Sequence, residues 1–160
     1  MPAIITGNHL IDGLDNLVAH LNTQKATWGI KNVFDYPIYV VGGATPPYIA
    51  VEPTQANPAI VQSDGSIIEW AHSLPYLIWF FSNDAKPRNA YRDVYLKLPQ
   101  IYNFLLENTS PNGFGRVISS DANLFPRITR MVTVENEGGG RHYGGAITVN
   151  IVFYAQQPIV

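Results

Sequence analysis

The spacing of apolar residues predicts an amphipathic helix over residues 9–24. Leu10, Leu14 and Leu17 recur at three- and four-residue steps, which places them on one face of an α-helix. Asn8 comes just before this run and has the side chain of a helix N-cap, whose oxygen satisfies a free backbone N–H in the first turn. We therefore expect this helix to lay its apolar face on a core.

The following part of the chain has the pattern of β-structure, because it is rich in β-branched and aromatic residues and is interrupted by proline and glycine. Ser63-Asp64-Gly65 lies between two apolar runs, a pattern typical of a hairpin turn. Residues 74–82 are apolar enough for a strand buried on both faces, although a short buried helix fits the same pattern. Strands are predicted over residues 34–41, 48–52, 59–62, 66–71 and 74–82.

A second helix is predicted over residues 86–108. Ala90, Val94 and Leu98 hold helical spacing, and the pattern continues to the polar stop after residue 107. Pro99 falls inside this pattern and lacks a backbone N–H, so we expect a kink there or two abutting helices. Three tyrosines are expected on the inner face of this helix, Tyr91, Tyr95 and Tyr102.

The last third of the chain returns to β-structure, with strands predicted over residues 116–120, 128–135 and 144–154. In the last of these, Ile147, Val149 and Ile151 share one face. Residues 136–143 form the loop between the two final strands. The element order predicts a single α+β domain over residues 1–160, with two main helices flanking a mixed or largely antiparallel sheet and β-strands at its C-terminal end.

Composition narrows the function classes. The chain has no cysteine, which excludes disulfides and thiolate metal sites, and its net charge is −2. Its ten basic residues are scattered along the sequence, which argues against direct nucleic-acid binding. The longest apolar run, residues 77–81, is too short to span a bilayer, and the first residues lack a signal-peptide pattern. Only 14% of residues are charged, which favours a chain with permanent partners.

Motifs for catalysis or cofactor binding are not found. The glycine run at 138–140 lacks the Lys-Ser/Thr of a phosphate-binding loop, and the four histidines show no metal-ligand spacing. Two carboxylate pairs can be drawn, Asp84 with Asp93 and Glu135 with Glu137, but their spacing does not place either pair in one pocket. We therefore expect no catalytic, cofactor-binding or metal-binding residues, and a protein that is not an enzyme.

The chain resembles the tail-terminator, or tail-completion, proteins of tailed bacteriophages. The resemblance is carried by the amphipathic N-terminal helix around residues 10–14, by the central helix at 91–106 after a β block, and by the terminal strand at 144–154. The resemblance covers nearly the full length of the chain. It concerns the order of the elements, the size of the chain and the kinds of residue in each segment, because these proteins have no short diagnostic motif. The glycine loop at 136–143 and the proline-rich stretch at 42–58 depart from it.

The resemblance implies a structural virion protein whose subunits form a hexameric ring, which caps the tail tube and joins it to the head connector. The implied partners are further copies of the chain, the tail tube protein, the head–tail connector or neck protein, and the tail sheath. DNA is implied only as passing cargo, and no membrane is involved. The implied place is the tail or neck of a virion assembled in the bacterial cytoplasm. Other neck proteins share this element order, so the position within the neck stays open.

The loop between the last two strands is the candidate interface with a subunit or partner, because hairpins offer backbone edges that can pair across chains. The candidate interface residues are Glu135 at the end of the preceding strand and, in the loop, Glu137, Gly138, Gly139, Gly140, Arg141, His142 and Tyr143. Two other interpretations remain open at this stage. One is a monomeric or dimeric α+β domain that binds a small ligand or catalyses a reaction, and the other is an adaptor in a non-viral assembly.

Overall fold

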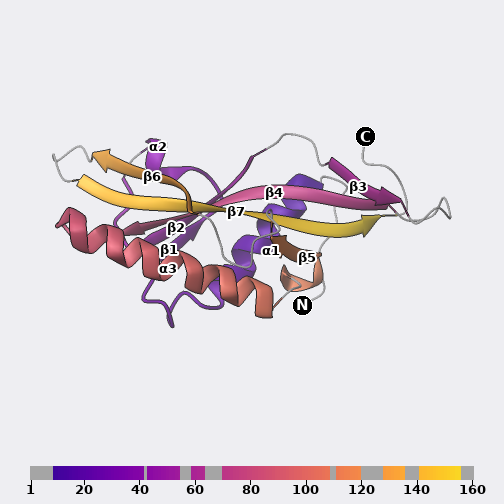
Figure 1. The fold of residues 1–160 in the computed structure, drawn as a ribbon, viewed down its shortest axis with the longest axis horizontal. Helices are drawn as coiled ribbons and strands as arrows, with labels where there is room; N and C mark the ends of the chain where they lie inside the picture. The colour runs from indigo at the N-terminus through magenta and orange to yellow at the C-terminus, as the bar shows by residue number, and fades with distance from the viewer. Residues whose placement is uncertain are drawn as a thin grey trace.

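The computed structural model describes residues 9–41, 43–54, 59–63, 70–108, 111–119, 128–135 and 141–155. These residues form an α+β fold, as the sequence predicts (Figure 1). The helices are α1 (His9–Asn22), α2 (Ile38–Val41), α3 (Pro87–Glu107) and a 3-10 turn, η1 (Pro111–Gly113). The strands are β1 (Asn32–Phe34), β2 (Tyr48–Pro53), β3 (Ala59–Ser63), β4 (Trp70–Ser82), β5 (Arg116–Ser119), β6 (Ile128–Glu135) and β7 (Arg141–Ala155).

Two long strands, β4 and β7, run side by side along the molecule (Figure 1). They pair antiparallel over all 13 residues of β4. Each of these strands has two shorter partners on its other edge. There, β2 and β3 pair with different parts of β4, and β5 and β6 pair with different parts of β7. The described strands form one sheet, and it is mixed because β1 joins β2 in parallel.

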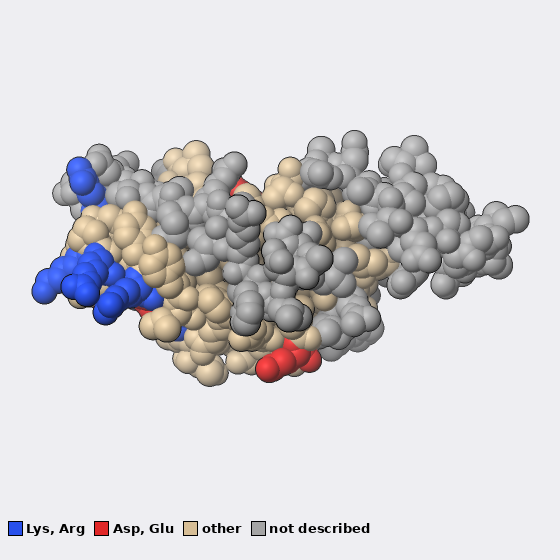
Figure 2. Space-filling view, in the orientation of Figure 1, with Lys and Arg blue, Asp and Glu red and all other residues tan. Residues whose placement is uncertain are grey.

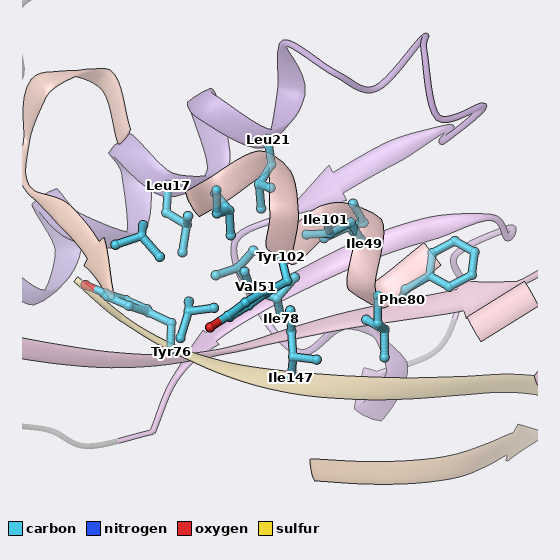
Figure 3. Packing of buried hydrophobic residues seen from close by; sticks show 14 of the residues in the cluster. Leu17, Leu21, Ile49, Val51, Tyr76, Ile78, Phe80, Ile101, Tyr102 and Ile147 are labelled. Atoms are coloured by element: carbon cyan, nitrogen blue, oxygen red, sulfur yellow. The ribbon is translucent and has the colours of Figure 1, made fainter. Parts of the chain in front are cut away.

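Both long helices cover the same face of the sheet. Alternate residues of β7, from Ile147 to Phe153, point to this face as expected, and they pack with alternate residues of β4. Figure 3 shows Leu17 of α1 and Tyr102 of α3 directed from the helices toward strand residues such as Ile78. Burial of these apolar side chains is the main force that holds helices and sheet together.

The opposite face carries a smaller aromatic cluster under α2. Tyr39 packs against the rings of Trp79 and Phe81, with centroids 4.7 and 5.5 Å away. Glu52 Oε1 accepts hydrogen bonds from the Tyr39 hydroxyl at 2.9 Å and from Trp79 Nε1 at 3.0 Å. One carboxylate therefore satisfies the polar atoms of both Tyr39 and Trp79 and anchors α2 to the sheet.

Helix α1 approaches β4 closely at Gly13. The Tyr76 hydroxyl donates a 2.7 Å hydrogen bond to the Leu10 carbonyl, and a Cβ on Gly13 would collide with that hydroxyl. Glycine at this position thus lets the helix lie directly on a buried tyrosine.

Helix α3 is continuous from Pro87 to Glu107 and runs through Pro99, so the alternative of two abutting helices is wrong. Pro87 occupies the first turn, where its missing N–H costs nothing. Burial of one face against β4 and β7 offsets the local cost of Pro99. None of the helices in the described ranges is long and apolar enough to cross a membrane.

The predicted strand at 34–41 is wrong over most of its length. The strand β1 ends at Phe34, and Ile38–Val41 form the single helical turn α2. Pro37 lies between them and cannot donate to a ladder, so it separates the two elements. The sequence predicts two strands at 66–71 and 74–82, whereas the structure has one continuous strand, β4, from Trp70 to Ser82. Residues 64–69 lie outside the described residues.

Candidate functional site

The base of the hairpin between β6 and β7 is the described part of the predicted interface. Glu135 pairs with Arg141 at the end of the ladder, and His142 and Tyr143 pair with the two preceding β6 positions. Arg141, His142 and Tyr143 therefore belong to β7 rather than to a loop, because β6 pairs with all three and β4 also pairs with Tyr143. Residues 136–140, with Glu137 and the three glycines, lie outside the described residues.

An aromatic contact joins this hairpin to α3. The Tyr143 side chain is buried and meets the Tyr91 ring edge to face, with centroids 5.3 Å apart. Such a contact stabilises the pair beyond the area that it buries. The start of β7 and the first turns of α3 are thereby held together as one end of the molecule.

A polar network fixes the turn that leads from β4 into α3. Ser82 Oγ donates to Asp93 Oδ2 at 2.8 Å and accepts from the Asp84 backbone N–H at 3.2 Å. Asp84 Oδ1 accepts from the Lys86 N–H at 2.9 Å, one residue before the helix begins. The structure thus brings Asp84 and Asp93 around one buried serine, where both acids have a structural partner.

Basic side chains gather at this end, which we call the basic end and define as Lys86, Arg88, Arg92 and Arg141. All four are exposed, and Figure 2 shows Lys and Arg atoms concentrated where α3 and β7 begin. These four residues are separated along the sequence, and the fold brings them together at one end. Helical spacing aligns Arg88 with Arg92, and the sheet brings Arg141 from a distant part of the sequence.

A histidine lies beside the basic end. His142 is partly buried in β7, and this burial lowers the pKa of its imidazole below the usual 6.5. The neutral form of the ring is therefore favoured, and the positive charge of this end comes from its lysine and arginines.

Two apolar residues continue the exposed face of α3 beyond the arginines. Leu96 is 75% exposed and Tyr95 is 52% exposed. The prediction that Tyr95 lies on the inner face is wrong, because Val94 and Leu98 define that face and Tyr95 is rotated about 100° from Val94. Tyr102 is buried as predicted, and Tyr91 is partly buried. Sequence spacing alone could have identified Leu96, which falls outside the apolar stripe.

Acidic residues gather on the other helix. Asp15 is exposed on α1, one turn after Ile11, which is 50% exposed. Partial desolvation, and then the charges of Asp35 and Asp12, raise the pKa of the Asp15 carboxyl. Asp35 follows β1, so the fold brings an acidic residue from another element close enough to act on the Asp15 carboxyl. Tyr36, next to Asp35, is 43% exposed.

The remaining titratable groups do not form a metal centre in the described ranges. No three His, Asp or Glu side chains there are placed to hold a metal ion. His20 Nε2 donates to the Asn108 carbonyl at 3.1 Å and packs against Phe104, which ties the end of α1 to the end of α3. Its role in this structure is therefore to join two helix ends.

The chain matches no protein-family model, and no curated protein is significantly similar to it.

Proposed function

We propose that this chain is a structural subunit of a phage tail, a tail terminator that closes the tail tube as a hexameric ring and joins it to the head connector. The observation that carries the proposal is the order of the elements. The resemblance to these proteins rests on four successive parts of the chain. They are a helix, a β block, a second helix and a final β block that ends in the long strand β7.

The two sides of the sheet support a ring. The described strands end at β1 and β3 on one edge of the sheet and at β5 and β6 on the other, so the two edges offer different surfaces. A closed ring needs heterologous contacts, in which one surface meets a different surface on the next copy. A subunit with unlike sides can repeat such a contact around an axis.

The tail tube protein, the connector or neck protein and the sheath are the proposed partners beyond the ring. The hairpin between β6 and β7 is the proposed point of docking, and DNA passes through the ring without being held. The proposed location is the tail or neck of a virion assembled in the host cytoplasm.

Tube capping tests this function directly. Tail tube protein from the same genome is polymerised with and without the purified chain, and tube lengths are measured by negative-stain electron microscopy. We expect short, capped tubes with a ring of density at one end, at substoichiometric amounts of the chain. Tubes that grow to their normal length in excess chain would contradict the proposal.

Native mass by light scattering separates the proposal from its alternative. A sixfold ring with a central hole agrees with the terminator. A compact dimer at every concentration, without an effect on tubes, favours the α+β domain that binds a small ligand.

A further inference from the structure

Two exposed surfaces of opposite charge lie on α3 and on α1 with the residues beside it. We call Arg88, Arg92, Tyr95 and Leu96 the α3 stripe, and Ile11, Asp15, Asp35 and Tyr36 the α1 patch. All eight side chains are exposed. Each surface combines charge with large apolar side chains, the combination found where a protein surface meets a partner.

The order of charge and apolar side chain is reversed between the two helices. In α3, Arg92 comes one turn before Leu96, whereas in α1 Ile11 comes one turn before Asp15. When two such helices lie antiparallel, Arg92 faces Asp15 while Leu96 faces Ile11. The spacing of four residues, about 6 Å along each helix, is the same on both sides of the match.

The two surfaces lie toward opposite sides of one molecule. Helix α1 packs over β1, β2 and β4, whereas α3 packs over β4, β7 and β5. Since the sheet order is β1-β2-β4-β7-β5, each helix covers its own half. The α3 stripe of one copy can therefore meet the α1 patch of the next.

We propose that the α3 stripe docks on the α1 patch of a second copy of this chain, in a head-to-tail contact centred on Arg92 with Asp15 and on Leu96 with Ile11. This inference rests on the proposed function and deepens it, because it assigns the contact that repeats around the ring. Charge complementarity identifies the occupant, because exposed Asp15 and Asp35 of one copy would face exposed Arg88 and Arg92 of the next.

Charge reversal with rescue by mixing tests the contact. The variants Arg92→Glu and Asp15→Arg each place like charges at every junction of a homomeric ring. We expect each alone to raise the concentration for half-assembly at least about tenfold, measured by light scattering and sedimentation velocity. Leu96→Ser is expected to weaken assembly as well.

An equimolar mixture of the two charge variants is expected to restore assembly. In alternating order, the introduced glutamate of one variant would meet the introduced arginine of the other, and the next junction would keep the native pair. This rescue requires that Arg92 of one copy meets Asp15 of another, and the mass from sedimentation velocity then separates a ring from a twofold dimer that forms both pairs at one interface. Raising salt from about 0.1 M to about 1 M is expected to weaken the wild-type assembly, because screening shortens the range of the charges.

Glu107→Arg is the matched control, since it reverses an exposed charge on α3 roughly 16 Å beyond Leu96. It is expected to assemble like the wild type, and thermal melts are expected to show all variants folded. Three outcomes would each overturn the inference. They are normal assembly of both charge variants, failure of the mixture to assemble, and a wild type that stays monomeric at high concentration and low salt. Tube capping by the wild type is scored separately, so a ring that forms through other residues leaves the proposed function intact.

Discussion

Ser82 and Asp93 are joined by a 2.8 Å hydrogen bond that connects the end of β4 to the second turn of α3. Ser82 is fully buried, and its hydroxyl also accepts from the Asp84 N–H. The direction in which α3 leaves the sheet, and with it the position of the basic end, depends on this serine.

Replacing Ser82 with alanine is therefore expected to destabilise the protein. The change leaves a carboxylate oxygen and a backbone N–H without their partner, at a cost of about 1–3 kcal/mol in the free energy of unfolding. Urea denaturation measures it. Ser73→Ala on the same strand, at a partly exposed position, is the control and is expected to change stability by less than about 0.5 kcal/mol. Equal effects of the two changes would contradict the role assigned to Ser82.

Gly13→Ala is expected to destabilise the protein, although alanine is favoured over glycine in a helix by about 1 kcal/mol. The new methyl group collides with the Tyr76 hydroxyl, which is held by the Leu10 carbonyl. In a Tyr76→Phe background the same change is expected to cost less, with a coupling above about 0.5 kcal/mol in a double-mutant cycle. Additive effects would show that the hydroxyl is not the obstacle.

Pro99→Ala is expected to stabilise the protein by more than about 1 kcal/mol, because proline in a helix interior is disfavoured by about 3 kcal/mol. Alanine restores an N–H that can donate to the carbonyl of Tyr95, four residues earlier. The rise in melting temperature is compared with Gln100→Ala, at the exposed neighbouring position, which is expected to be nearly neutral. A lower melting temperature for Pro99→Ala would mean that packing of the proline ring outweighs the backbone.

Stability is expected to fall as the pH drops from about 7 to about 5, because of two histidines. Burial lowers the pKa of His20, an effect that the hydrogen bond to Asn108 only partly offsets, and burial also lowers the pKa of His142. The unfolded chain therefore takes up protons first as the pH falls below 6.5, which favours unfolding; above that pH the effect is absent.

His20→Gln and His142→Gln are each expected to flatten this pH dependence, measured as the free energy of unfolding at several pH values. The raised pKa of Asp15 acts in the opposite direction, since the folded state there takes up its proton first. Comparison of each variant with the wild type removes that contribution. An unchanged slope in both variants would contradict the prediction.

The elements with strong periodic patterns could be predicted from sequence. Both long helices and β7 have apolar residues at their own period, and burial then selects the same face that the pattern marks, as Ile147 and Ile151 show. The continuity of β4 could not be predicted at His72 and Ser73, because polar residues interrupt its apolar pattern. Pairing with β3 and β7 on its two edges continues the strand there.

The candidate site was predictable in part. Glycines and turn residues mark the hairpin between β6 and β7, which depends on local sequence. The basic end is not local, because Arg141 joins Arg88 and Arg92 only through the pairing of β7 with β4. Likewise, the proximity of Asp35 to Asp15 follows from the packing of α1 beside β1, and no pattern within either segment encodes it.

The shared length of β4 and β7 has a mechanical consequence. The ladder between them spans 13 residue pairs and its hydrogen bonds lie across the strands. A pull that draws the two strands past each other along the long axis loads these bonds in shear, so that many must break together before the strands slide. A force that peels one strand end outward meets them one after another. The molecule should therefore resist stretching along its length far better than peeling at its ends.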